Sequence, residues 1–104
     1  MKYGLDPIVI EKIQGVFRAY RSIDKALLYG SRAKGTYRPG SDIDLTLEGE
    51  NLSFSLLNKL RNDLDDLNLP YTFDISVLAD IENRDLLDHI KRVGVVFYSK
   101  DSTA

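Results

Sequence analysis

Two short segments of this chain alternate strictly between apolar and polar side chains. In residues 42–47 every odd position is apolar, and the even positions begin with Asp42 and Asp44. Residues 71–77 repeat the pattern, with Asp74 in the middle of the polar side. Because successive side chains of a strand point to opposite faces, each segment predicts a strand with one apolar and one polar face. A sheet built from both strands buries one face and carries three carboxylates on the other.

Helical patterns and one short apolar run surround these two strands. Asp6 and Pro7 are typical of a helix start, with the carboxylate as cap and proline at the first helical position. Ser53 is a second predicted cap, and Gly94 is a predicted helix stop. The expected order is helix 6–20, strand 26–29, loop 30–41, strand 42–47, helix 53–67, strand 71–77, helix 86–93 and closing strand 95–98. This order predicts an α/β (α+β) fold, a small mixed sheet with helices packed on one face.

The length and the cysteine content narrow the possibilities further. A chain of 104 residues with 43% hydrophobic side chains supports one core, because domains typically run to about 100–150 residues. We therefore expect residues 1–104 to form a single domain. The sequence contains no cysteine, which excludes a disulfide scaffold, a thiolate zinc site and a cysteine nucleophile. Any metal ion must therefore bind to oxygen ligands.

The charge and the distribution of apolar residues exclude other classes of protein. A net charge of -2 argues against direct nucleic-acid binding, because neutralising phosphates requires a basic excess. No apolar run approaches the roughly 20 residues that span a bilayer. Asp6 and Pro7 interrupt the N-terminus where a signal peptide needs an unbroken apolar stretch. We expect a cytoplasmic protein that does not bind a membrane.

The segment after the first predicted strand suggests a phosphate site. Gly30 lets the backbone approach an anion closely, and Ser31, if it opens a short helix, offers free backbone N–H groups and a hydroxyl. Arg32, Lys34 and Arg38 concentrate positive charge in the same loop. The alternative interpretation is an ordinary strand-to-loop turn with solvated basic side chains.

The polar faces of the two alternating strands suggest a metal site. Asp42 and Asp44 project from the same face, so their carboxylates can bind one divalent cation or bridge two. Hard oxygen ligands favour Mg²⁺, with Mn²⁺ as the alternative. Two such ions, roughly 3.5–4 Å apart, hold the attacking and leaving oxygens of a phosphoryl transfer. Asp74 is the expected third ligand, and Asp80, which falls past the predicted strand end, is the other candidate.

The segment from Gly30 to Asp44, GSRAKGTYRPGSDID, resembles the motif of the DNA polymerase beta-like nucleotidyltransferase superfamily. Within that superfamily the whole chain is similar to the minimal nucleotidyltransferases known as MNT antitoxins. The resemblance implies that Gly30 and Ser31 contact the triphosphate of ATP or another nucleoside triphosphate. It also implies that Asp42 and Asp44 bind two Mg²⁺ ions, and that Asp74 completes the site and helps activate the attacking hydroxyl. Arg32 would assist with phosphate binding, and Ser41 would position the strand.

The same resemblance implies a partner. Similar proteins neutralise a HEPN-domain ribonuclease toxin, some of them by transferring AMP from ATP to a tyrosine of that toxin. We therefore expect an antitoxin that acts within a hetero-complex or an oligomer. A template-directed polymerase is not expected, because this short chain shows no additional domain that could hold a primer.

Other interpretations also follow from the sequence. The chain could neutralise its partner by stoichiometric binding without catalysis, or it could sense ATP without transferring anything. Gly30 and Gly35 have the spacing of an NTPase phosphate-binding loop, but Thr36 stands where that loop requires lysine. His89 has no second histidine near it, and we assign it no role.

Overall fold

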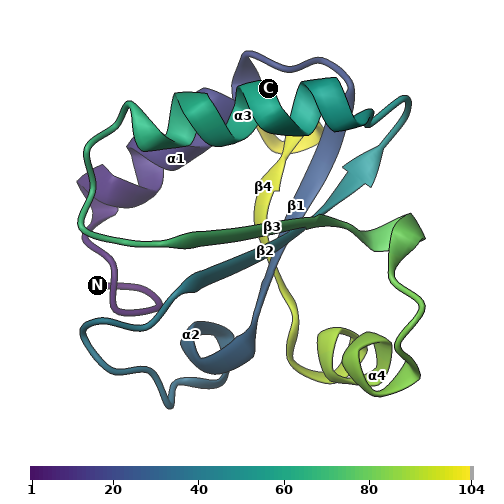
Figure 1. Ribbon diagram of the computed structural model, residues 1–104. Coiled ribbons are helices and arrows are strands. Elements are labelled where there is room, and N and C mark those ends of the chain that lie inside the picture. The colour runs from purple at the N-terminus through teal and green to yellow at the C-terminus, as the bar shows by residue number, and fades with distance from the viewer. Residues whose placement is uncertain (104) are drawn as a thin grey trace.

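A computed structural model describes residues 1–103 as a four-stranded sheet flanked by helices (Figure 1). The chain alternates between helices and strands, and it differs from the predicted order in one place, because a short helix occupies the first part of the predicted loop 30–41. The elements are α1 (Pro7–Arg18), β1 (Ile23–Tyr29), α2 (Gly30–Lys34), β2 (Ile43–Gly49), α3 (Phe54–Asp65), β3 (Phe73–Val77), α4 (Arg84–Val93) and β4 (Val95–Ser99), with single 3-10 turns at Leu78–Asp80 and Lys100–Thr103.

The sheet is mixed, with the strand order β3-β2-β1-β4. Strand β1 pairs antiparallel with both β2 and β4, whereas β2 and β3 are parallel. The register places Tyr29 of β1 opposite Asp44 of β2, and Asp44 opposite Asp74 of β3. The end of β1 and the beginnings of β2 and β3 therefore meet at one edge of the sheet.

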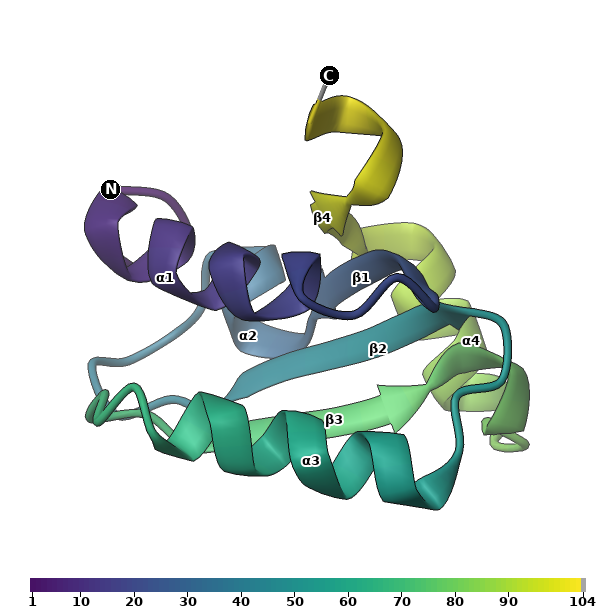
Figure 2. The same cartoon turned by 90° about the horizontal axis from the view of Figure 1, so that it is seen from above.

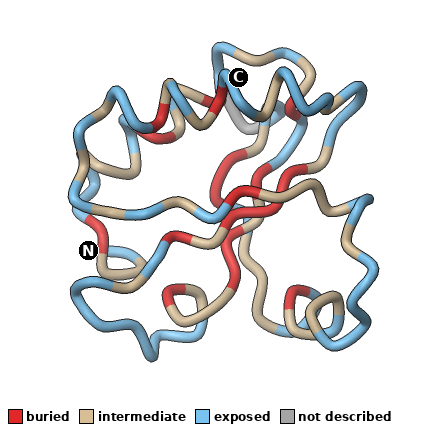
Figure 3. The backbone as a smooth tube through the Cα atoms, viewed as in Figure 1, coloured by how far each residue is buried: buried red, intermediate tan, exposed pale blue. Residues whose placement is uncertain are grey.

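The main core lies between the sheet and helices α1 and α3. These two helices lie side by side on the same face of the sheet (Figure 2). The buried residues follow the crossing strands and the inner sides of the helices (Figure 3). Core members include Leu5, Ile13, Phe17, Ala26, Leu28, Ile43, Leu45, Leu47, Leu60, Leu64, Ile75 and Phe97. The odd-numbered residues of the two alternating strands up to Ile75 thus face this core, as the sequence predicts.

Helices α2 and α4 lie on the opposite side of the sheet (Figure 1). The mixed α/β class is confirmed, while the expected packing of helices on one face holds for α1 and α3 alone. The reason is that the second face is apolar toward β1, where Leu27 shares a groove with Leu87 and Ile90 of α4. The apolar stripe of α4 covers that part of the face.

The helix ends agree with the predicted signals in most respects. Ser53 caps α3 by accepting a hydrogen bond from the Leu56 N–H at 3.2 Å. Pro7 is the first residue of α1, but the Asp6 side chain makes no capping hydrogen bond, contrary to the prediction. The backbone carbonyl of Asp6 instead accepts the first bonds of the helix. Within residues 1–103 no helix is long and apolar enough to cross a membrane.

Candidate functional site

Three carboxylates lie at the edge where β1 ends and β2 and β3 begin. Asp44 is half-buried in β2, Asp74 is exposed at the matching position of β3, and Asp42 is exposed just before β2. Burial, followed by the charges of Asp74 and Asp42, raises the pKa of the Asp44 carboxyl to about 6, while the charge of Arg32 opposes the rise. The structure thus brings the three predicted carboxylates close enough for their charges to interact.

Asp80 was the other candidate for the third acidic position. It lies in the 3-10 turn Leu78–Asp80 that follows β3, and its side chain is exposed. It is not among the charges that shift the pKa of Asp44, whereas Asp74 is. The strand register therefore favours Asp74.

Gly30 lies directly against the central carboxylate of this group. It follows β1 with a φ of 75°, a backbone conformation that residues with a side chain rarely adopt. A methyl group at this position would overlap Oδ2 of Asp44. Ser31 follows in the first turn of α2 and is half-buried. The glycine-serine turn predicted to bind phosphate is thus adjacent to Asp44.

The donor chemistry of the site fits a hard divalent cation. Its candidate ligands are carboxylate oxygens, which Mg²⁺ and Mn²⁺ prefer, and a cation between them would relieve the repulsion that raises the pKa of Asp44. In the part of the chain that the structure describes, no group of three or more His, Asp or Glu side chains is arranged to hold a metal ion. The three carboxylates share an edge without forming a closed ligand set.

Arg32 does not lie where a phosphate ligand is expected. Its side chain is 2% exposed, and the guanidinium donates hydrogen bonds to the carbonyl oxygens of Tyr3 at 2.9 Å and Ser41 at 2.8 Å. The rings of Tyr37 and Tyr71 lie 5.6 and 4.9 Å from its central carbon. Backbone carbonyls and aromatic rings therefore surround this cation, and its contact with phosphate stays a prediction.

Other residues of the loop keep their positive charge at the surface. Lys34 and Arg38 are exposed, so they can approach an anion bound near the glycine-serine turn. Ser41 accepts a hydrogen bond from the Arg38 N–H at 2.8 Å through its hydroxyl. Ser41 thus shapes the entry into β2, in agreement with the positioning role expected from the sequence.

His89 is a residue that sequence reasoning missed. Its Nε2 accepts a hydrogen bond from the backbone N–H of Gly30 at 3.0 Å, and its ring meets the ring of Tyr29 edge-on at 6.2 Å. One signal was available, because His89 directly precedes the buried Ile90 on α4. It therefore borders the side of the helix that packs on the sheet.

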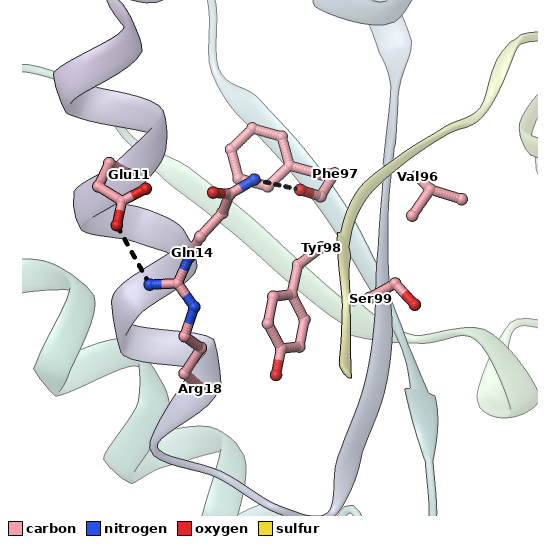
Figure 4. Close-up of a pocket in the computed structure, with 7 residues that line it drawn as sticks. All are labelled: Glu11, Gln14, Arg18, Val96, Phe97, Tyr98 and Ser99. Atoms are coloured by element: carbon pink, nitrogen blue, oxygen red, sulfur yellow. Dashed lines mark hydrogen bonds and ion pairs between the residues drawn. The ribbon is translucent and has the colours of Figure 1, made fainter. Parts of the chain in front are cut away.

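A groove of about 660 Å³ lies away from these carboxylates, between α1 and β4 (Figure 4). Gln14 of α1 donates a hydrogen bond to the carbonyl oxygen of Phe97 at 2.9 Å, and Arg18 pairs with Glu11 at 3.3 Å. None of the candidate site residues lines this groove. The groove is therefore separate from the candidate site.

Comparisons with known proteins agree with the geometry. Residues 11–103 match the family described as Polymerase beta, Nucleotidyltransferase. No curated protein matches the sequence significantly.

Several solved structures share the fold. A toxin-antitoxin with AMP-PNP is 20% identical, with a TM-score of 0.71 over 89% of this chain and 75% of that chain. A mutant of the toxin-antitoxin MntA-HpeT is 17% identical, with a TM-score of 0.69 over the same shares, 89% and 75%. A protein from Sulfolobus solfataricus assigned as a nucleotidyltransferase is 17% identical, with a TM-score of 0.56 over 88% of this chain and 78% of that chain. At these identities the likeness shows a common fold.

Proposed function

Because the chain belongs to the polymerase beta nucleotidyltransferase family, we propose that it transfers a nucleoside monophosphate from a nucleoside triphosphate to a hydroxyl group of a partner protein. More specifically, it is an antitoxin that transfers AMP from ATP to a tyrosine of a HEPN-type ribonuclease toxin. The observation that carries the proposal is the register that places Asp44 beside Asp74, with Gly30 against the Asp44 carboxylate. Residues 1–104 act as one cytoplasmic domain in this proposal.

The structural neighbours support the choice of nucleotide and partner. One toxin-antitoxin structure with this fold contains AMP-PNP, an ATP analogue. The other is a mutant with two aspartate-to-glutamate changes two positions apart, which is the spacing of Asp42 and Asp44 in this chain. The HEPN class of the partner rests on the resemblance of the Gly30–Asp44 motif.

Each site residue has a role in this reaction. Asp42, Asp44 and Asp74 would hold the divalent ions that members of the family typically use, two Mg²⁺ ions or Mn²⁺ in their place. When bound, these ions supply positive charge beside the triphosphate. The backbone N–H groups and hydroxyl of the Gly30–Ser31 turn hold phosphate oxygens. The barrier falls mainly through alignment and charge neutralisation.

The transfer needs only ATP and the tyrosine hydroxyl as reactants. The tyrosine oxygen forms a bond to the α-phosphorus of ATP as the bond from that phosphorus to the bridging oxygen breaks, and pyrophosphate leaves. The proton of the hydroxyl passes to the carboxylate of Asp74, which is exposed on the outer strand β3. Because Asp42 and Asp74 face solvent, a hydroxyl presented by another protein can reach the site.

Intact-mass analysis of the toxin tests the proposal. We expect the toxin to gain one or more AMP units after incubation with this chain, ATP and Mg²⁺, and to gain none with a chelator. Asp42→Asn, Asp44→Asn and Asp74→Asn should lose the labelling, since each removes a charged ligand at constant size. Asp80→Asn is the matched control and should label normally. Full labelling by the three site variants would overturn the catalytic assignment.

A second candidate function is stoichiometric binding of the partner without catalysis. The observation that favours it is that the carboxylates form no closed ligand set within residues 1–103. In that case the toxin is neutralised at a one-to-one ratio, with excess chelator and without nucleotide. If small amounts of the chain with ATP suffice, transfer is the mechanism. Metal-dependent ATP binding with no adduct on the toxin would indicate a nucleotide sensor instead.

A further inference from the structure

The contact between His89 and Gly30 joins two elements that are far apart in the sequence. The two residues are separated by 59 positions, and the Gly30 N–H donates to Nε2 of His89 at 3.0 Å. An imidazole that accepts through Nε2 carries its proton on Nδ1. The ring is half-buried and is held edge-on against Tyr29. His89 therefore reaches the glycine-serine turn in a defined orientation.

This contact is made to Gly30, the residue of the candidate site with the greatest backbone freedom. Glycine is the most permissive residue in backbone conformation, and Gly30 has a φ of 75° where the chain leaves β1. The first N–H groups of a helix have no partner within the helix, and His89 supplies the partner for Gly30. The hydrogen bond thus fixes the peptide plane between Tyr29 and Gly30. The bond thereby anchors the residue that directly precedes Ser31, at the start of the turn.

We propose that His89 is a positioning residue for the nucleotide site, which holds the Gly30–Ser31 turn in its phosphate-binding conformation from helix α4. The inference rests on the proposed function and deepens it, because it assigns α4 a part in binding the triphosphate. His89 bonds to the backbone of the turn, so it acts through the turn and not on the reacting atoms. Without this bond only a fraction of the molecules would hold the turn correctly. The apparent affinity for nucleotide is then the intrinsic affinity multiplied by that fraction.

Variants at position 89 separate the hydrogen bond from simple packing. His89→Leu keeps an apolar side chain against Tyr29 but removes the acceptor, whereas His89→Gln places an amide oxygen near the position of Nε2. We expect His89→Leu to raise the KM for ATP about 2- to 10-fold, the range that a net hydrogen bond contributes. The kcat at saturating ATP should stay close to that of the original protein. His89→Gln should restore the KM, and Asp88→Asn, at an exposed position of the same helix, is the matched control.

Two measurements that do not depend on transfer complete the test. Calorimetry with AMP-PNP and Mg²⁺ gives the nucleotide affinity directly, and amide hydrogen exchange reports the protection of the Gly30 N–H. We expect both affinity and protection to fall in His89→Leu and to return in His89→Gln. If the leucine variant does not fold, His89→Asn replaces it, because its shorter amide cannot reach Gly30.

Three outcomes would overturn the inference. The first is a Gly30 amide that is unprotected from exchange in the original protein. The second is an unchanged affinity for AMP-PNP in the folded His89→Leu or His89→Asn variant. The third is a His89→Gln variant that binds AMP-PNP as weakly as the variant without an acceptor. If the original protein protects Gly30 but binds no AMP-PNP, the proposed function itself fails. The exchange data would distinguish this result from a failure of the His89 contact.

Discussion

The guanidinium of Arg32 binds backbone from two separate parts of the chain. It donates to the carbonyl oxygen of Tyr3 near the N-terminus and to that of Ser41 just before β2. Its flat, fully charged head can serve several acceptors at once while it stacks on aromatic rings. A residue expected to bind substrate therefore anchors the loop that leads to Asp42 and Asp44.

Arg32→Lys should destabilise the protein, although the charge is kept. A lysine amine cannot reproduce the planar fork, so at least one buried carbonyl loses its partner at a cost of about 1–3 kcal/mol. Thermal unfolding should show a clearly lower melting temperature than for the original protein. Arg38→Lys is the control, because Arg38 is exposed. Equal melting temperatures for the two variants would contradict the anchoring role.

Asp44 should make stability depend on pH with a sign that is unusual for an aspartate. Its pKa in the folded chain is about 6, above the ordinary value of 3.8. The folded state therefore holds the proton more tightly, so this contribution to stability is present below about pH 4 and is lost as the pH rises through 6. At neutral pH the charged carboxylate opposes folding in the absence of a cation.

Asp44→Asn should consequently be more stable than the original protein at neutral pH, by about 1–2 kcal/mol after allowance for its partial exposure. The difference should vanish near pH 4. Unfolding measured with chelator across this pH range checks the prediction, and Mg²⁺ should then stabilise the original protein alone. An asparagine variant that is less stable at neutral pH would contradict the destabilisation of the charged Asp44 carboxylate by its burial and by the neighbouring carboxylates.

Among the elements, helix α1 is destabilised by a glycine in its middle. Gly15 is exposed in the middle of the helix, and a methyl group there would meet no atom within 4 Å. Ile13 and Phe17 on the other side of α1 are fully buried in the core. A side chain at position 15 would therefore affect the backbone conformation of the helix but not its packing against the sheet.

Gly15→Ala should stabilise the protein by about 0.5–1 kcal/mol, since glycine loses more backbone freedom in a helix than alanine does. For a domain of this size we expect a melting temperature a few degrees higher and unchanged transfer activity. Gly94→Ala is the opposite case, because a methyl group at the end of α4 would overlap the Ile90 carbonyl oxygen. If both substitutions shift the melting temperature equally, the result would contradict the prediction that an alanine side chain fits at position 15 and clashes at position 94.

The pairing of strands β2 and β3 assembles the candidate site. Parallel pairing of β2 and β3 in the register Asp44↔Asp74 brings together carboxylates that are 30 positions apart in the sequence. On the same face, Ser76 donates a hydrogen bond to Thr46 at 2.9 Å, one step further along both strands. A shift of one residue would turn Asp74 toward the core. The register is thus secured by the apolar side chains on the opposite face.

For the whole molecule, nucleotide binding should appear as a gain in stability. A ligand that binds the folded state alone, at 100 times its Kd, stabilises it by about 2.7 kcal/mol. Mg²⁺ with AMP-PNP should therefore raise the melting temperature, and unfolding should remain one cooperative transition if residues 1–104 form a single domain. Calorimetric scans with and without ligand check both points, with Asp44→Asn as the variant that should not respond. Two separate transitions would contradict the single domain.

The sequence predicted the parts of this protein that depend on near neighbours. Alternation located the two strands that carry Asp44 and Asp74, although β2 begins at Ile43, directly after Asp42, and β3 begins at Phe73, later than predicted. Helical spacing located α1, α3 and α4, and the short closing strand is present as β4. Alternation also placed the carboxylates opposite the core, because the direction of a side chain in a strand follows from its position alone.

The remaining features depend on partners that are distant in the sequence. Arg32 binds Tyr3 across 29 positions, and His89 binds Gly30 across 59. No local pattern distinguishes a buried arginine from a solvated one, or a lone histidine that orders a turn from one at a helix end. No local pattern predicted that α4 would cover the second face of the sheet either. That position depends on Leu27 of β1, which shares a groove with Leu87 and Ile90 of α4. Periodicity encodes which way a side chain points, whereas what it meets depends on how the elements pack.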